Sequence, residues 1–341
     1  MIDIYEINNG IAYQLRIPMN IEPGHVFSYI VRRDNDCIMI DAGYPNNELI
    51  KPITETIGKI PNCRLSALVV THMHIDHYGL ANELSNHLKV SVAIHKRDYE
   101  QLMRINDTSR FIQESLDYFR YYGVPNQELP ILRSIIEWII KRVRLSFMNP
   151  DIIIDKEDQL FDGLRIVLTP GHSPGHIAII LDQYRIAFTG DLILPTITTH
   201  VGLTPINSGN PLMEYMKSLI KIKMMNLKCL YPGHEGYVCR INERITELLN
   251  HRFARICEVL SVLKNEPMSI FGVTGKLKWM DNRNYSSLDP MNKYLALSET
   301  AAIMKYLESL GVIKRDEGKY YMIRDINCEP KLLLPQEYEN K

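Results

Sequence analysis

The sequence carries almost no net charge and contains no long apolar run. Its 341 residues include 39 lysines and arginines against 40 aspartates and glutamates, a formal net charge of −1. This balance gives no overall electrostatic basis for binding nucleic acid or a membrane surface. No stretch approaches the roughly 18 uninterrupted apolar residues of a membrane-spanning helix, so no membrane partner is expected. The N-terminus carries Asp3 and Glu6 where a signal peptide has a basic segment, so a cytoplasmic protein is expected.

Cysteine is also scarce and scattered. The chain has 6 cysteines, and none of them forms a C-x-x-C pair. A disulfide framework is not expected in a chain of this size that is taken to be intracellular. Cys37 and Cys229 lie in apolar, strand-like runs, so we interpret them as buried thiols without a chemical role.

Short apolar segments separated by turn residues predict a sheet-rich first part. Expected strands lie between residues 11 and 42 and at 65–70, 90–95, 152–154, 165–168, 177–180, 185–188 and 229–231. Helices are expected at residues 47–57, 79–87 and 211–222. This alternation indicates an α/β class in which helices cover the sheets.

Residues 98–148 break that alternation. Apolar residues recur there at helical spacing, and Pro125 and Pro130 divide the stretch into two helical blocks. We therefore predict an inserted helical subdomain. Its aromatic side chains are candidates for lining a substrate pocket, the alternative being that they form the core of the insert. They are Phe111, Tyr118, Phe119, Tyr121, Tyr122 and Trp138.

The character of the chain changes to helix near residue 242. Helices are expected at 244–263, 269–278 and 297–310, followed by a hairpin made of 312–315 and 319–322. This order is typical of a winged-helix domain, so the predicted division is 1–240, 241–325 and a tail of 326–341. Residues 242–324 carry 13 lysines and arginines against 10 acids, a net of +3. This excess does not by itself indicate RNA binding. The simpler interpretation is that the extension packs on the first domain, closing a wall of the cleft, or forms a homodimer contact.

Two histidine-rich stretches carry the strongest chemical signal. The motif HMHIDH occupies residues 72–77, directly after the apolar run 67–70, and the motif GHSPGH occupies residues 171–176. Histidine nitrogens and carboxylate oxygens are the ligands of zinc and its neighbours in sites that stay open for chemistry. The ligands of the first motif would crowd one metal ion, so division between two ions is the natural reading. Later strand ends supply further donors, each preceded by glycine. These donors are His172, Asp191 and His234.

The order of these motifs resembles that of the metallo-β-lactamase superfamily. HMHIDH, GHSPGH, Gly190-Asp191 and Pro232-Gly233-His234 occur in the typical sequence, and Asp41-Ala42-Gly43 matches an earlier Asp-x-Gly motif. The resemblance covers residues ~20 to ~240 and includes a glyoxalase II-like dinuclear site. It implies an αββα sandwich, here with a helical insert and a small C-terminal winged-helix-like domain.

The resemblance also implies a ligand set. His72, His74 and His172 would hold the first metal ion, and Asp76, His77 and His234 the second, with Asp191 bridging both. Asp41 would orient a ligand from behind. His176 matches a position that does not usually bind metal. Two other histidines, His95 and His200, lie where they could approach the cleft, although a structural role is the expectation for His95. Two divalent ions are therefore expected as cofactors, with zinc favoured and manganese or iron compatible with the same donors.

A dinuclear centre of this kind indicates hydrolysis. Two divalent ions lower the pKa of a shared water from ~15.7 toward ~7, and the resulting hydroxide attacks a carbonyl or phosphoryl centre. Asp76 is the candidate for accepting a proton from the nucleophile. The expected partner is a small-molecule ester, thioester or lactone. Leu194 weakens the homoserine-lactone alternative, because related lactonases have tyrosine at that position. An endoribonuclease acting on RNA, which the net charge opposes, and a non-catalytic binding protein are the alternatives.

Overall fold

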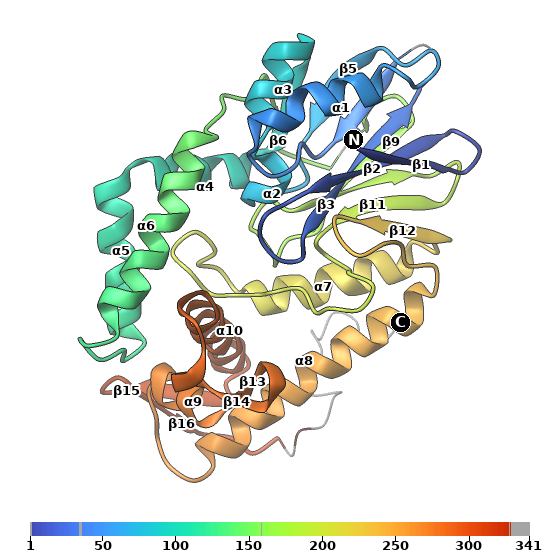
Figure 1. The fold of residues 1–341 in the computed structure, drawn as a ribbon. Coiled ribbons are helices and arrows are strands. Elements are labelled where there is room, and N and C mark those ends of the chain that lie inside the picture. Colours follow the sequence, from blue (N-terminus) through green and yellow to red (C-terminus); the bar gives the residue numbers. More distant parts are fainter. Residues whose placement is uncertain (1, 34–35, 158, 327, 329–341) are drawn as a thin grey trace.

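The protein contains two facing β-sheets with helices outside them (Figure 1). The structure is a computed structural model that describes residues 2–33, 36–157, 159–326 and 328. The first sheet has the order β1-β2-β3-β4-β5-β6-β7, and the second has the order β12-β11-β10-β9-β8. Both are mixed, since β4 to β7 run parallel and β11 pairs parallel with β12, whereas the other neighbours are antiparallel. Two facing mixed sheets with helices outside them agree with the predicted αββα sandwich.

The strand bounds agree closely with the alternation of apolar and turn residues. The first sheet consists of β1 Asp3–Ile7, β2 Ala12–Pro18, β3 His25–Arg32, β4 Cys37–Ile40, β5 Leu65–Val69, β6 Ser91–His95 and β7 Ile152–Ile154. The second consists of β8 Gln159–Phe161, β9 Leu164–Leu168, β10 Ile177–Leu181, β11 Ile186–Gly190 and β12 Cys229–Pro232. Strands β1 and β8 were not predicted. Both are edge strands, where apolar alternation is weakest.

The core has two parts because the central strands are buried on both faces. In β4, Ile38 and Ile40 face the layer between the sheets, and Cys37 and Met39 face the helices. Helices α1 (Ile50–Ile57) and α3 (Ala81–Leu88) lie on the first sheet, and α7 (Pro211–Met224) lies along the second (Figure 1).

The helical insert lies between β6 and β7 as predicted, but it has three helices. They are α4 Lys96–Asn106, α5 Thr108–Tyr121 and α6 Leu129–Leu145. The missed break is at Asp107, whose φ of −77° and ψ of 75° end α4 and start α5 without any proline. Pro130 lies in the first turn of α6, where its missing N–H costs nothing.

The C-terminal segment contains helices and a hairpin. They are α8 Ile241–Leu263, α9 Ile270–Lys276, α10 Pro290–Ser309, and the strands β15 Ile313–Asp316 and β16 Lys319–Met322. A pair of two-residue strands, β13 Lys278–Trp279 and β14 Arg283–Asn284, precedes α10. Helix α10 begins well before the predicted residue 297, because Asp289 caps it by accepting the Asn292 N–H at 3.0 Å. Of the predicted tail, 326–341, all but residues 326 and 328 lie outside the described part.

The cysteine prediction is wrong. Cys37 is bonded to Cys63 and Cys229 to Cys239, with Cα–Cα distances of 5.4 and 4.1 Å. Both pairs link positions that adjacent strands bring together, which spacing along the chain does not reveal. The expectation of free thiols rested on taking the chain to be intracellular, and the two disulfides give that premise no support. Among the described residues, no helix is both long enough and apolar enough to cross a membrane.

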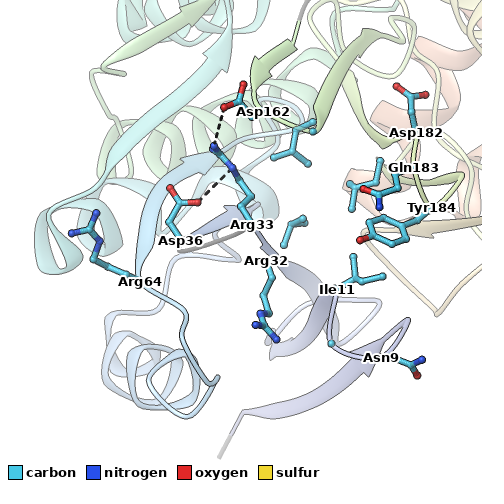
Figure 2. A pocket seen from close by; sticks show the side chains of 15 residues that line it. Asn9, Ile11, Arg32, Arg33, Asp36, Arg64, Asp162, Asp182, Gln183 and Tyr184 are labelled. Carbon is cyan, nitrogen blue, oxygen red and sulfur yellow. Dashed lines mark ion pairs between the residues drawn. The ribbon is translucent and has the colours of Figure 1, made fainter.

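Strand turns gather at one end of the sandwich and surround a hollow of about 840 Å³ (Figure 2). Arg33 lies there between Asp36 and Asp162, at 3.5 and 3.9 Å. Strands β5 and β11 start at this end and run away from it. The predicted metal ligands follow the far ends of β5, β9, β11 and β12, so they lie at the opposite end of the sandwich.

Candidate metal centre

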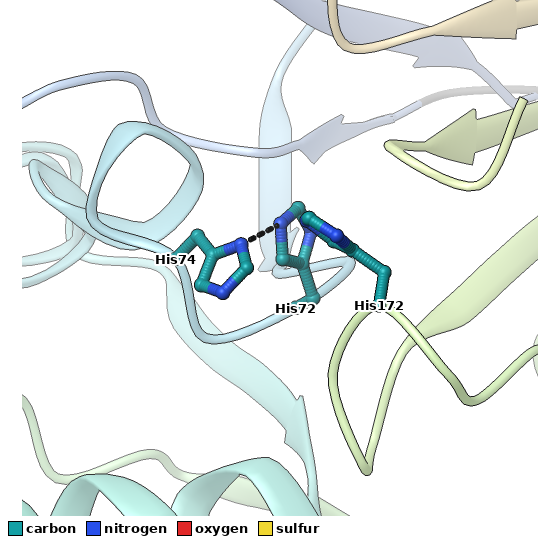
Figure 3. Close-up of side chains that lie close together, drawn as sticks. All are labelled: His72, His74 and His172. Atoms are coloured by element: carbon teal, nitrogen blue, oxygen red, sulfur yellow. Dashed lines mark hydrogen bonds between the residues drawn. The ribbon is translucent and has the colours of Figure 1, made fainter. Parts of the chain in front are cut away.

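Three histidines form the first cluster of potential ligands. His72 and His74 lie in the loop after β5, and His172 lies in the loop after β9 (Figure 3). Their ligand atoms all lie within 4.8 Å of one another. His72 Nε2 and His74 Nδ1 are 3.1 Å apart. Two loops from opposite sheets therefore bring three imidazoles to one point.

The second cluster consists of Asp76, His77, Asp191 and His234, whose ligand atoms also lie within 4.8 Å of one another. Asp76 and His77 belong to the short helix α2 (Ile75–Tyr78), where the prediction placed only a loop. Asp191 directly follows β11, and His234 follows β12 by two residues. The structure thus brings together all seven residues predicted as ligands.

Asp191 connects the two clusters. Its Oδ1 lies 3.3 Å from His77 Nε2, and its Oδ2 lies 3.5 Å from His234 Nε2. The same Oδ2 lies 3.7 Å from His172 Nε2 of the first cluster. His176 lies outside both clusters and accepts the Asp191 N–H at Nε2, at 3.2 Å.

Four of the five histidines in the two clusters have a hydrogen-bonding partner at Nδ1 that fixes the orientation of the ring. The partner of His77 is Asp41 Oδ2 at 2.8 Å, which confirms the predicted role of Asp41. The other three partners are Thr71 Oγ1 for His72, the His200 carbonyl for His172 and the His25 carbonyl for His234. A partner at Nδ1 fixes the ring and leaves Nε2 free to bind a metal ion.

Buried ligand atoms that face the interior of the clusters support a metal-binding role. His172 Nε2 is buried and has no hydrogen-bond partner among the described residues, and the buried pair His77 Nε2 and Asp191 Oδ1, 3.3 Å apart, forms no aligned hydrogen bond. Such orphaned atoms are costly unless something satisfies them. Imidazole and carboxylate donors at this spacing fit divalent ions of the zinc type.

The two clusters differ in charge. Burial and the neighbouring His172 lower the pKa of His74 to about 3, so its ring is neutral, which is the form that binds metal. Burial would also lower the pKa of His234, but the Asp191 and Asp76 carboxylates outweigh it and raise that pKa to about 10. The carboxylates thus make the second cluster the more attractive one for a cation.

Asp98 in α4 supports both histidine loops. Its Oδ2 accepts the Met73 N–H at 2.8 Å and the Ser173 hydroxyl at 2.7 Å, and its Oδ1 accepts the Gly175 N–H at 2.5 Å. The side chain is fully buried, and this burial raises the pKa of the carboxyl to about 6 against the effect of its hydrogen bonds. Sequence reasoning missed Asp98, because no motif marks it.

The C-terminal helices also reach the site. Arg252 of α8, only 1% exposed, donates to the Thr199 carbonyl, next to the His200 carbonyl that holds His172. Glu299 of α10 lies 3.5 Å from Arg252 Nη1 and 3.2 Å from Arg255 Nε. Through these contacts a buried ion network in the extension fixes the loop that orients a ligand of the first cluster.

Replacing Glu299 with glutamine should loosen this network. Breaking a buried ion pair by removing one partner costs about 3–5 kcal/mol, and loss of support behind a metal ligand costs about 10- to 100-fold in metal affinity. Chemical denaturation and competition with a chelating dye would measure the two effects. The control is Glu258→Gln, which removes the exposed partner of Arg255. Unchanged metal affinity in a destabilised Glu299 variant would restrict the network to a role in folding.

A cavity of about 490 Å³ opens onto both clusters. The insert contributes Ile105, Trp138 and Val143, and α10 contributes Met291 and Leu295. The loops at the metal ligands contribute further apolar side chains, namely Met73, Ile75, Leu194, Ile197 and Ile206. The floor is therefore polar and the walls are largely apolar, which is typical of a small-molecule site.

The position of the cavity distinguishes the two roles considered for the aromatic residues of the insert, lining a substrate pocket or forming the core of the insert. Trp138 lines the cavity. Phe111, Phe119 and Tyr122 are buried in the core, and Tyr118 and Tyr121 line a different hollow between α5 and α10. His200 lines the cavity beside the clusters, whereas His95 begins α4 and accepts the Arg97 N–H at 3.2 Å.

Comparison with known proteins agrees with this geometry. The family described as the Metallo-beta-lactamase superfamily matches residues 21–234. The "Beta-lactamase-like protein 2 homolog" of Caenorhabditis elegans is 25% identical over 295 residues, which cover 84% of this chain and 80% of that protein. The "Probable metallo-hydrolase YqjP" of Bacillus subtilis is 25% identical over 307 residues, which cover 86% and 91%. A beta-lactamase domain protein from Burkholderia ambifaria shares the fold with a TM-score of 0.77 and 23% identity, over 94% of each chain.

Two shorter matches have more specific names. The "Hydroxyacylglutathione hydrolase GloC" of Haemophilus influenzae is 27% identical over 212 residues, covering 60% of this chain and 82% of that protein. The "Atrochrysone carboxyl ACP thioesterase" of Aspergillus fumigatus is 24% identical over 240 residues, covering 70% and 59%.

Proposed function

The chain belongs to the metallo-beta-lactamase superfamily, and on this premise we propose that it is a dinuclear metallo-hydrolase of small esters, thioesters or lactones. The observation that carries the proposal is the apolar cavity that ends at the two ligand clusters. A cavity of about 490 Å³ accommodates a small molecule rather than a polymer. The similarity to a thioesterase and to a hydroxyacylglutathione hydrolase supports the acyl class.

The ligand residues would divide between two metal ions. His72, His74 and His172 would hold one ion, and Asp76, His77 and His234 the other, with Asp191 contacting both. When bound, such a pair makes water nucleophilic at neutral pH and polarises the substrate carbonyl; zinc suits this donor set. Asp76, 3.2 Å from His234, would accept the proton of the attacking water. The apolar walls would exclude bulk water and hold the acyl group.

We propose that residues 1–240 form the hydrolase domain, with the insert as a cap, and that residues 241–325 form a winged-helix-like domain. In its support, α8, α9 and α10 precede the β15–β16 hairpin, and Met268 bridges to Tyr320 of β16. Met291, Tyr294 and Leu295 of α10 line the cavity, so the role proposed for this domain is to close one wall of the site.

A substrate panel tests the function. Protein loaded with zinc or manganese is offered a thioester, an aryl ester, a lactone, a simple phosphodiester and single-stranded RNA. We expect turnover of an ester, a thioester or a lactone that His72→Ala abolishes. RNA cleavage without turnover of any of these three would replace the proposal by the nuclease alternative. Two bound metal ions without turnover of any substrate would favour a binding protein.

A further inference from the structure

We propose that Arg142 binds a carboxylate of the substrate, so that the enzyme acts on small esters or thioesters that also carry a carboxylate group. This inference rests on the proposed acyl hydrolysis and adds a specificity determinant to it. Arg142 belongs to α6 of the insert and lines the cavity that opens onto the ligand clusters. It is the only lysine or arginine among the residues that line this cavity.

The guanidinium of Arg142 is held in place from two sides. Its Cζ lies 3.6 Å from the centre of the Trp138 ring, and Trp138 also lines the cavity. Its Nε donates to the Tyr44 hydroxyl at 3.1 Å. Stacking and a hydrogen bond at Nε together fix the plane of the group. A fixed guanidinium is better prepared for a ligand than a mobile lysine would be.

This cation lacks an acidic partner. No carboxylate of the described residues lies within 4 Å of Arg142, although Glu22 lines the same cavity. Four other arginines of the insert do have one: Arg104 and Arg110 pair with Glu114, Arg120 with Asp117, and Arg133 with Glu137. Arg142 therefore borders the cavity without a carboxylate partner, so its guanidinium can bind an anionic ligand there.

A carboxylate is the ligand that fits this arrangement. Nε donates to Tyr44, and Nη1 donates one of its two hydrogens to the Trp138 carbonyl at 3.5 Å. The second hydrogen of Nη1 and those of Nη2 remain for a carboxylate, which can accept from both nitrogens with its two oxygens. Apolar walls such as Ile139 and Leu194 suit a short hydrocarbon segment of the same substrate. The preferred molecule therefore has a scissile acyl bond at the clusters, an apolar segment, and a carboxylate at Arg142.

A matched pair of substrates tests the inference on the full-length, zinc-loaded protein. One is the phenyl monothioester of adipic acid, and the other is the same compound with its free carboxyl group capped as a methyl ester. We expect the free acid to have at least about a tenfold higher kcat/KM, because a charge-assisted hydrogen-bonded pair contributes roughly 10- to 100-fold. Arg142→Met should remove this preference, and Arg142→Lys should keep part of it. The control is Arg133→Met, which changes an ion-paired arginine on the same helix and outside the cavity.

A binding experiment distinguishes failure of this inference from failure of the proposed function. Adipate and its dimethyl ester are titrated by calorimetry against the wild type and the Arg142→Met variant. Tighter binding of adipate that depends on Arg142 supports the inference even where neither thioester is cleaved, a result that would overturn only the acyl-hydrolase proposal. Equal kcat/KM for the two thioesters, or a preference and an adipate affinity that survive Arg142→Met, would overturn the inference. If Arg142→Met does not fold, the wild-type preference and the Arg142→Lys variant decide.

Discussion

Asp191→Asn is expected to leave the protein with fewer than two tightly bound metal ions and at least about a hundredfold lower hydrolase activity. Asp191 is the residue whose carboxylate approaches both clusters, with Oδ2 at 3.7 Å from His172 Nε2 and 3.5 Å from His234 Nε2. Asparagine offers one neutral oxygen in place of two charged ones, so it cannot serve both ions. Because partners behind the ligands alone are worth about 10- to 100-fold, loss of a shared ligand should cost more.

Elemental analysis after dialysis measures the metal content, and the thermal midpoint with and without a chelator gives a second reading. Ligands that bind only the folded state raise stability by about 2.7 kcal/mol at a hundred times their Kd. The chelator should therefore lower the midpoint of the variant less than that of the wild type. Asp182→Asn is the control, since Asp182 pairs with Arg165 on the surface. Two tightly held ions per chain in Asp191→Asn would contradict the bridging role.

The ligand set could be predicted because its signal is local. Each ligand follows a predicted strand or lies in a motif of a few residues, so the pairing of strands brings the ligands together without any knowledge of side-chain packing. The role of Asp41 came from the resemblance of Asp41-Ala42-Gly43 to a motif of the superfamily, and the structure places its carboxylate 2.8 Å from His77 Nδ1. The sheets were predicted for a related reason, since a strand buried on both faces is a compact apolar run.

The supporting residues could not be predicted, because their partners are distant in the chain. Asp98 binds groups 25 and 77 residues away, and Arg252 binds a carbonyl 53 residues away. In the sequence each is one charged residue on a helix, the commonest kind of solvated position. The two disulfides were missed for a different reason: their cysteines are 26 and 10 residues apart, and strand pairing, which spacing does not reveal, brings them together. Arg142 gave no signal either, since only the cavity distinguishes it from the other arginines of the insert.

Asp98→Asn is expected to lower stability by about 2–5 kcal/mol and to weaken metal binding at least tenfold. Three donors converge on the Asp98 carboxylate, namely the Met73 and Gly175 N–H groups and the Ser173 hydroxyl. An asparagine amide turns its own NH₂ group toward at least one of these donors, which leaves a buried donor unpaired at about 1–3 kcal/mol, and charge-assisted bonds are lost as well. Chemical denaturation of the metal-free protein would measure the first effect.

The metal effect should follow because Asp98 joins the loop that carries His72 and His74 to the loop that carries His172. Freed from their common support, the two loops lose the fixed spacing of the first cluster, whereas the second cluster retains Asp41 behind His77. Weakening should therefore be greater for one ion than for the other, which stepwise metal titration resolves. Asp151→Asn is the matched control, since Asp151 is exposed and accepts one backbone N–H, that of Val92, away from both loops. Equal loss at both sites, or none at either, would mean that Asp98 stabilises α4 without positioning the first cluster.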